Sequence, residues 1–257
     1  MSNEEQTAAF AAIEHNITSL REKIAAAENA SPYHKNVTLM AVTKTVDADR
    51  INHAIDVCGI RCIGENRVQE LCDKYPLLHL DGVSVHLIGS LQSNKVKYII
   101  DKVDMIHSLD SLSLAKEIDR QAKKHGKTMD CLIEINIGRE ESKGGSAPEE
   151  EEILRFYDTV TTDYPAVRIR GLMTIAPNTG DTSAYHRYFS ETKALFDALC
   201  EKRLSRVAGM EPVLSMGMSG SYEEAILCGS DIVRVGSGIF GARQYPPKAG
   251  MGEPEQK

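Results

Sequence analysis

Short apolar runs alternate with amphipathic stretches along most of the chain. Residues 4–29 carry apolar side chains at nearly helical spacing, which predicts a long N-terminal helix that ends at Ser31-Pro32. Eight apolar runs follow, and each is short and bounded by polar sequence, as in strands that are buried on both faces. We expect these strands at residues 37–44, 61–65, 83–89, 104–108, 130–136, 167–173, 213–217 and 231–235.

The segments between these strands have helical periodicity. We expect helices at 47–57, from 66 onwards, and at 92–100, 111–125, 148–162, 182–204 and 221–228. Strict alternation of strands and helices is typical of the α/β class, and eight such units in 257 residues predict a (β/α)8 TIM barrel with an extra N-terminal helix. A doubly wound open sheet is the alternative, although it usually has fewer strands. We expect one domain over 1–257, with the barrel at about 30–243 and a flexible tail at 244–257.

Composition and charge exclude several classes of partner. The chain is 42% hydrophobic, which is enough for a sizeable core, and its net charge of −7 comes without a basic block, so we expect no nucleic-acid partner. The longest apolar runs are far too short to span a bilayer, and the N-terminus is acidic and polar, unlike a signal peptide. We therefore expect no membrane partner and a cytoplasmic location.

Cysteine and histidine positions favour neither disulfides nor a metal site. The six cysteines are scattered and form no C-x-x-C pair, so we interpret them as reduced thiols, most of them buried. The histidines outside the strands, His186 among them, lie in loops and helices without the spacing of metal ligands. We expect no metal.

One lysine lies where barrels place their chemistry. Lys44 closes the first strand, and the carboxyl ends of strands carry the active sites of α/β folds. A desolvated lysine loses its proton more easily and can attack a carbonyl group. A lysine that extends from a strand end into water is the simpler interpretation, and this stretch alone favours it.

Two loops rich in glycine and serine follow strands seven and eight, at 216–221 and 235–241. Loops at this position in barrels often bind phosphate, because glycine lets backbone N–H groups approach an anion and Ser219 and Ser237 add donors. Arg234, near the end of strand eight, should point to the same mouth. Ordinary turns and a rim ion pair are the alternatives. A buried lysine, an anion site and an arginine together suit a phosphorylated aldehyde such as pyridoxal 5′-phosphate (PLP), with Lys44 as its Schiff base.

Seven motifs occur in a characteristic order between about Leu39 and Gly241. They are Thr43-Lys44 and residues 64–70, 86–95, 107–110, 171–173, 214–219 and 233–241. In these motifs the sequence resembles the pyridoxal phosphate homeostasis protein family, whose members are single-domain relatives of the barrel of alanine racemase. The number and order of the motifs make the resemblance specific.

The resemblance implies a PLP-binding barrel in which Lys44 carries the cofactor covalently. By the same match, Ser219 and the backbone of Gly236 and Ser237 hold the phosphate, and Arg234 faces the pyridine nitrogen. Further residues match positions at or near the pocket, namely Asn66, His86, Ser108, Asn136 and Met173.

The expected function is that of a PLP carrier. An arginine has no proton acceptor and should keep the pyridine nitrogen unprotonated, which weakens PLP as an electron sink. Racemisation needs a base on each face of the substrate, and the residues after Gly241 are too few for the second domain that completes the related racemases. Tyr222 is the one tyrosine we expect near a phosphate loop.

We therefore expect a monomer that binds PLP reversibly, limits the free aldehyde and supplies the cofactor to apo-enzymes, without robust catalytic activity. A PLP-dependent amino-acid racemase of weak activity is the first alternative. A phosphosugar enzyme with Lys44 as an aldolase-type Schiff base is the second.

Overall fold

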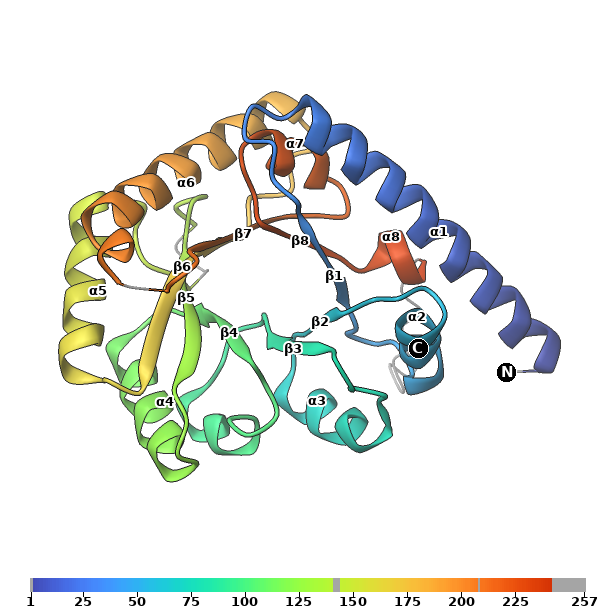
Figure 1. Cartoon of the computed structure of the whole chain (residues 1–257), viewed down its shortest axis with the longest axis horizontal. Coiled ribbons are helices and arrows are strands. Elements are labelled where there is room, and N and C mark those ends of the chain that lie inside the picture. Colours follow the sequence, from blue (N-terminus) through green and yellow to red (C-terminus); the bar gives the residue numbers. More distant parts are fainter. Residues whose placement is uncertain (1, 141–143, 208, 242–257) are drawn as a thin grey trace, which may run out of the picture.

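A closed barrel of eight parallel strands forms the centre of the molecule (Figure 1). This computed structural model describes residues 2–140, 144–207 and 209–241. The strands pair in sequence order, and the eighth closes the barrel by pairing with the first. They are β1 (Thr38–Val42), β2 (Cys62–Glu65), β3 (Ser84–Leu87), β4 (Met105–Leu109), β5 (Met129–Ile135), β6 (Val167–Thr174), β7 (Val213–Met218) and β8 (Ile232–Val235).

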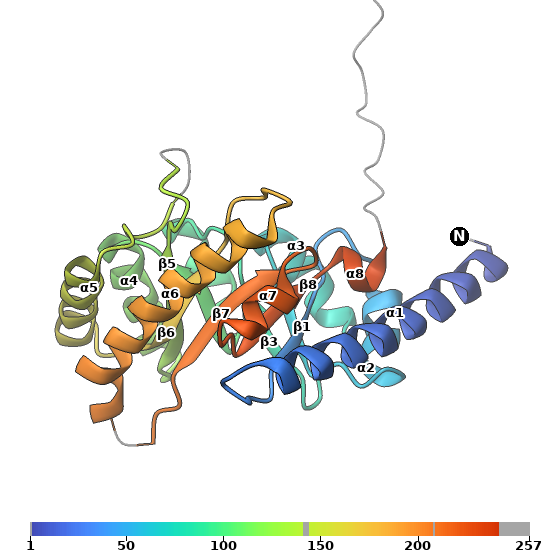
Figure 2. The same ribbon diagram turned by 90° about the horizontal axis from the view of Figure 1, so that it is seen from above.

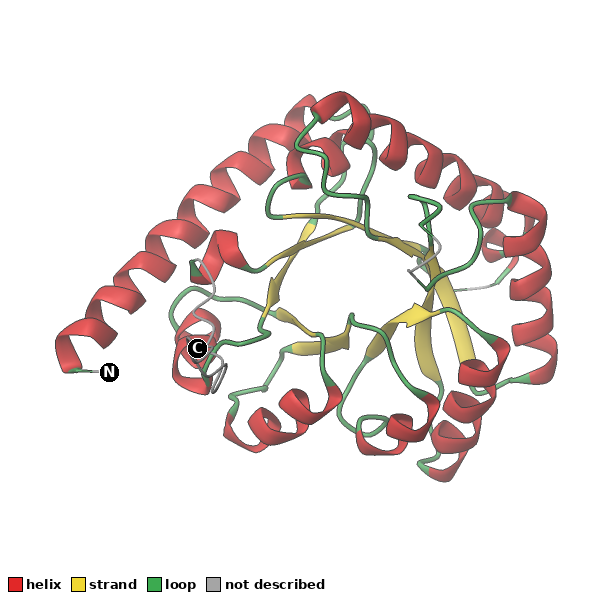
Figure 3. Ribbon diagram, turned by 180° about the vertical axis from the view of Figure 1, so that it is seen from behind, coloured by secondary structure: helices red, strands yellow, loops and turns green. Residues whose placement is uncertain are grey.

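Helices form an outer layer around this ring of strands (Figure 3). They are α1 (Asn3–Ala30), α2 (Ala48–Asp56), α3 (Val68–Lys74), α4 (Leu112–Lys124), α5 (Glu150–Asp163), α6 (Thr182–Lys202), α7 (Tyr222–Leu227) and α8 (Ser237–Phe240). Short 3-10 helices span Tyr75–Leu77, Ser93–Tyr98 and Leu204–Arg206. The predicted (β/α)8 barrel with an extra N-terminal helix is confirmed, and the open sheet is excluded by the pairing of β8 with β1.

The N-terminal helix α1 begins with a capping box. The hydroxyl of Ser2 accepts a hydrogen bond from the Glu5 N–H, and the Glu5 carboxylate accepts one from the Ser2 N–H. Ile13 and Ile17 are buried on the inner face of the helix, which packs along α2, α7 and α8 (Figure 2). The extra helix therefore covers the side of the barrel where the last strand meets the first.

One predicted helix differs in kind. The stretch predicted as a helix at 92–100 is a 3-10 helix over Ser93–Tyr98. Val96 is buried within it, and Ile99 and Ile100 are buried just after its end, so the helical spacing of these three side chains predicted a longer element than the 3-10 helix that forms.

Parallel pairing brings distant loops together at one rim. Because all eight strands run the same way, their carboxyl ends lie at the same end of the barrel. The strands β7, β8, β1 and β2 are consecutive neighbours, so the turn after β1 lies beside the loops that follow β7 and β8. The predicted tail at 244–257 lies outside the described residues. No helix in the described ranges is long and apolar enough to cross a membrane.

Candidate functional site

A pocket of about 630 Å³ opens at the carboxyl ends of β1, β2, β7 and β8. Six of the residues predicted from the sequence line it, namely Lys44, Asn66, Ser219, Arg234, Gly236 and Ser237. Apolar walls come from Val42, Ile88 and Phe240. The fold thus gathers most of the predicted site from four different strand ends.

The turn that carries Lys44 is held in an unusual conformation. Lys44 is half-buried, and the next residue, Thr45, has a φ of 63°, a left-handed value that β-branched residues rarely adopt. The Thr45 N–H donates to Glu70 Oε1 at 2.5 Å, and Lys74 Nζ donates to the Thr43 carbonyl at 2.8 Å. Because Lys74 also pairs with Glu70, the turn is fixed on both sides of the lysine.

A buried carboxyl group connects this turn to the next loop. Glu65 Oε2 accepts from the Thr43 hydroxyl at 3.0 Å, and Glu65 Oε1 accepts from the Asn66 N–H at 2.7 Å. Burial raises the pKa of Glu65, and the nearby Lys74 ammonium partly offsets this effect. Glu65 therefore positions the loop of Asn66 against the turn of Lys44.

The loops after β7 and β8 converge on one oxygen atom. Ser219 Oγ accepts from the backbone N–H groups of Gly236 and Gly238, both at 3.3 Å. An extra residue in β7 between Ser215 and Met218 shifts its register against β8 and directs this loop toward the pocket. Two backbone donors and a hydroxyl group at one point form an arrangement that suits an oxyanion.

Asn66 presents an unsatisfied polar atom. Its Oδ1 is buried, and in the described part of the chain it is the one buried side-chain nitrogen or oxygen without a hydrogen-bond partner. A Cβ at Gly89 would lie 2.3 Å from the Asn66 carbonyl oxygen, so only glycine allows β3 to end this close. The Ser108 hydroxyl donates to the Gly89 carbonyl at 2.7 Å and so supports Asn66 from behind the pocket wall. A buried acceptor without a partner costs about 1–3 kcal/mol, which a bound group can relieve.

Arg234 is fixed at the base of the pocket. Its side chain donates to Ser215 Oγ at 2.7 Å and to the Thr174 carbonyl at 2.8 Å. Burial lowers the pKa of Arg234 to about 10, so the guanidinium stays charged at neutral pH. The pocket therefore contains an oriented cation that can donate protons in hydrogen bonds but cannot accept one.

A chain of hydrogen bonds runs from Arg234 through the barrel interior. Ser215 Oγ lies 3.1 Å from His107 Nδ1, His107 Nε2 lies 2.8 Å from His86 Nδ1, and His86 Nε2 lies 2.7 Å from Ser84 Oγ. Burial lowers the pKa of His86 to about 4 and that of His107 well below its usual value, so both rings are neutral. Since Arg234 only donates, each member of the chain can accept from one neighbour and donate to the next.

This chain ends at the opposite mouth of the barrel. His86 and Ser84 line a second pocket, of about 690 Å³, at the amino ends of β1, β2, β3 and β8. His86 therefore does not line the first pocket, and it reaches Arg234 only through His107 and Ser215.

Two further predicted residues also lie away from the pocket lining. Asn136 Nδ2 donates to the Glu140 carbonyl at 2.9 Å, and this bond shapes the loop after β5. Met173 is fully buried and packs against Met105 and Leu132. The assignment of Asn136 and Met173 to the site, like those of His86 and Ser108, stays a prediction.

Tyr222 follows Ser221 of the loop after β7, as expected, but a second tyrosine that we did not expect from the sequence lines the pocket. Tyr185, from the first turn of α6, lines the pocket together with Asn178, whose Oδ1 accepts from the Tyr185 hydroxyl at 3.0 Å. Tyr222 is buried in α7, and burial raises its pKa to about 12. The place of Tyr185 in the sequence could have indicated this, because Tyr185 lies in the first turn of the helix that follows the loop after β6.

Sequence comparisons agree on one family. Residues 9–244 match the family model of the alanine racemase N-terminal domain. The sequence is 43% identical over 220 residues to a pyridoxal phosphate homeostasis protein from Aquifex aeolicus, which covers 86% of this chain and 93% of the relative. It is 38% identical over 241 residues to the Escherichia coli protein of the same name, which covers 92% of this chain and 99% of the relative.

Solved structures agree with these matches. PipY from Synechococcus elongatus with PLP bound is 32% identical, with a TM-score of 0.73 over 89% of this chain and 100% of PipY. Its structure without PLP gives a TM-score of 0.77 at 31% identity. Alanine racemase from Clostridium difficile is similar in fold alone, with a TM-score of 0.64 at 16% identity over 91% of this chain and 58% of the racemase.

Proposed function

Because the chain belongs to the pyridoxal phosphate homeostasis protein family, which has the fold of the alanine racemase N-terminal domain, we propose that it binds PLP covalently through Lys44. The observation that carries this proposal is the convergence of a lysine, a fixed arginine and a loop pair that suits an oxyanion on one pocket of about 630 Å³. The PLP-bound structure of the relative PipY supports the same class of ligand.

The residues present fit each part of the cofactor. Ser219 and the N–H groups of Gly236 and Gly238 suit a phosphate, since the serine hydroxyl can turn to donate once phosphate oxygens accept from the two N–H groups. The amide of Asn66 can present either its oxygen or its nitrogen to the ring substituents when it turns about its last torsion. Lys44 supplies the amine for the aldehyde.

Arg234 makes the site better suited to storage than to catalysis. When bound, PLP supplies an aldehyde that reacts with amines and a pyridine ring that withdraws electrons best when its nitrogen is protonated. Arg234 is held by Ser215 and Thr174 and has no acceptor atom, so it cannot stabilise a proton on that nitrogen. The role that follows is reversible binding that limits free PLP.

We further propose that the protein acts as a monomer and supplies PLP to apo-enzymes. The sheet is closed into a barrel, so it has no free edge strand that could pair with a second copy. Light scattering tests whether the protein is a monomer. Transfer is tested by the activation of an apo-transaminase by the PLP-loaded protein, with and without a dialysis membrane between the two proteins. No activation in either arrangement would contradict the supply role.

A weak racemase is the second candidate, and Tyr185 favours it. Racemisation needs two bases, and Tyr185 lines the same pocket as Lys44. The assay is racemisation of L-alanine by the PLP-loaded protein and by Tyr185→Phe. Sustained turnover by the wild type that disappears in Tyr185→Phe would contradict the carrier role and indicate a racemase. No turnover in either protein would support the carrier role.

The proposal is tested by the absorbance spectrum of the protein after incubation with PLP and removal of excess. We expect a yellow protein, a colourless Lys44→Ala variant and a yellow Lys124→Ala control, because Lys124 is an exposed residue of α4. A colourless wild type would contradict PLP binding and favour the phosphosugar enzyme, whose Schiff base is colourless.

A further inference from the structure

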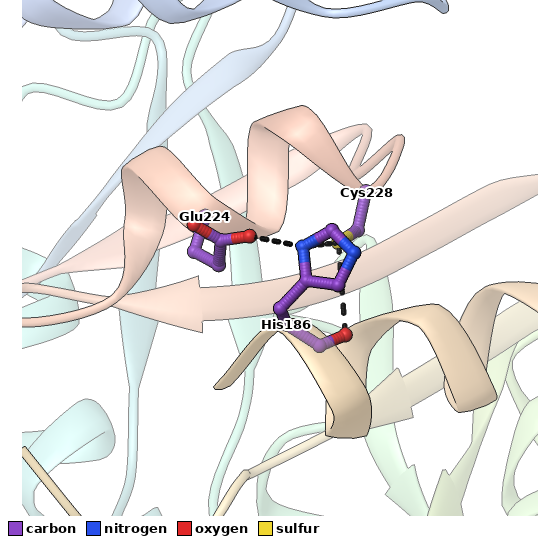
Figure 4. Close-up of side chains that lie close together, drawn as sticks. All are labelled: His186, Glu224 and Cys228. Atoms are coloured by element: carbon purple, nitrogen blue, oxygen red, sulfur yellow. Dashed lines mark hydrogen bonds and ion pairs between the residues drawn. The ribbon is translucent and has the colours of Figure 1, made fainter. Parts of the chain in front are cut away.

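Three metal-ligating side chains meet on the outside of the barrel, between α6 and α7 (Figure 4). His186 comes from the first turns of α6, whereas Glu224 and Cys228 lie four residues apart on one face of α7 and at its end. One ligand atom from each lies within 4.8 Å of the other two. Over the described ranges, this is the one group of three such residues that meets this condition.

The distances between these atoms are close to those of a coordination site. His186 Nδ1 lies 3.8 Å from Cys228 Sγ and forms a hydrogen bond with Glu224 Oε1. Zinc bonds of about 2.0–2.1 Å to nitrogen and about 2.3 Å to sulfur, at a tetrahedral angle, set N and S about 3.5 Å apart. The His186 side chain is 60% exposed, so it can move the small distance that opens its contact with Glu224 to about 3.3 Å.

The protein holds the two acidic donors in place. Cys228 is 4% exposed, and Ser190 Oγ lies 3.6 Å from its sulfur. The Glu224 side chain is only 12% exposed. Burial raises the pKa of the Cys228 thiol. Two donors are therefore fixed by packing, and the third closes the site from the solvent side.

We propose that His186, Glu224 and Cys228 form a Zn²⁺ site that links α6 to α7. A thiolate, an imidazole and a carboxylate together suit zinc, whereas Mg²⁺ and Ca²⁺ take oxygen ligands. On binding, the Cys228 thiol releases its proton to solvent, the three residues supply one bond each, and water occupies the fourth position.

The site is separate from the pocket that Lys44 lines. None of its three ligands lines that pocket, in contrast to Tyr185, which precedes His186, and Ser221, which precedes α7. Zinc here would join the two helices behind one wall of the pocket. The proposal does not depend on PLP binding, because its ligands and its test involve only the outer surface.

Cobalt titration of the full-length protein tests the site. Co²⁺ bound by a thiolate in a tetrahedral site gives a charge-transfer band in the near ultraviolet and strong visible bands. Difference spectra against the same sample before addition cancel any absorbance from PLP. We expect one equivalent to saturate both bands in the wild type and in Cys200→Ser, a control because Cys200 lies in α6, as His186 does, but outside the cluster.

Cys228→Ser should lose the charge-transfer band. His186→Asn changes an exposed side chain, so the fold is retained, and it should weaken Zn²⁺ binding at least tenfold in competition with a chromophoric chelator. Zn²⁺ should also raise the melting temperature of the wild type but not that of Cys228→Ser. Equal Zn²⁺ affinity in the wild type and His186→Asn, or no charge-transfer band in the wild type, would overturn the proposal and leave only the hydrogen bond between His186 and Glu224.

Discussion

The two ends of the barrel carry pockets of similar size, about 630 Å³ at the carboxyl end and about 690 Å³ at the amino end, but their polar groups differ. At the amino end the charged side chains bond to the loops around them. Arg61 donates to the carbonyls of Ile55 and Ile60, and Glu28 accepts from the Val37 N–H. These bonds close the loops below the barrel.

At the carboxyl end, polar groups point into the pocket. Asn66 Oδ1 is buried without a partner in the described part of the chain, and two backbone N–H groups share the single oxygen of Ser219. Volume therefore does not identify the site. The site is identified by polar groups that are fixed in position but lack some of their hydrogen-bond partners. Such groups occur at the carboxyl end, where barrels carry their catalytic and binding residues.

The largest expected difference between the ends concerns their arginines. Arg234→Met removes the donors to Ser215 Oγ and to the Thr174 carbonyl inside the barrel, and should lower the free energy of unfolding by about 2–4 kcal/mol. Arg61→Met, at the exposed amino end, should cost less than about 1 kcal/mol. Urea denaturation measures both, and equal losses would mean that the two ends do not differ in this way.

The buried histidines should give stability a particular pH dependence. The pKa of His86 is about 4 in the folded protein against 6.5 without burial, so between these values only the unfolded chain takes up the proton. The free energy of unfolding should therefore have its full value above about pH 6.5 and should decrease as the pH falls toward about 4. Across this pH window, the free energy of unfolding of His86→Gln should fall by about 2 kcal/mol less than that of the wild type. His15→Gln changes an exposed position in α1 and should behave like the wild type.

The measurement is the free energy of unfolding from urea titrations across this pH range. The same slope in the wild type and His86→Gln would contradict a neutral, buried His86.

Two serines compare the pockets directly. Ser219→Ala removes a hydroxyl from the loop pair at the carboxyl end and should raise the PLP dissociation constant at least about tenfold. Ser84→Ala removes a hydroxyl from the amino-end pocket and should change that constant by less than about twofold. Equilibrium titration followed by absorbance measures both, and a larger effect of Ser84→Ala would place the phosphate at the other mouth.

The smallest effect concerns two residues with left-handed backbone. Thr45, with φ 63°, follows Lys44 at the carboxyl end, and His34, with φ 46°, precedes β1 at the amino end. Thr45→Gly relieves the strain of a β-branched residue and should stabilise the protein by about 0.5–1 kcal/mol. His34→Gly should gain less, since histidine tolerates this conformation better. Thermal unfolding compares them, and destabilisation by Thr45→Gly would show that the turn is unstrained.

The sequence was informative wherever a side chain has a fixed place along a strand. The eight apolar runs predicted the strands, and parallel pairing then implied that Lys44 and Arg234 would meet at one rim. The glycine and serine residues after β7 and β8 predicted the loop pair for the same reason. Each of these predictions needs only the order of the elements and the direction of the strands.

Contacts between separate elements had no such signal. His107 and Ser215 meet across the barrel although 108 residues separate them, and only the rarity of polar residues inside apolar strands hints at this contact. His186 and Cys228 are 42 residues apart, and their meeting depends on how α6 packs against α7. Spacing along the sequence could not reveal it, because the three residues of the proposed site come from two helices.

Covalent attachment of PLP to Lys44 is the central claim, and borohydride reduction followed by peptide mass mapping tests it most directly. Borohydride converts a Schiff base into a stable amine, so the modified lysine is identified by sequence. We predict a single reduced PLP adduct on the peptide that contains Lys44. An adduct on another lysine, such as the neighbouring Lys74, or no adduct on a protein saturated with PLP, would contradict the account.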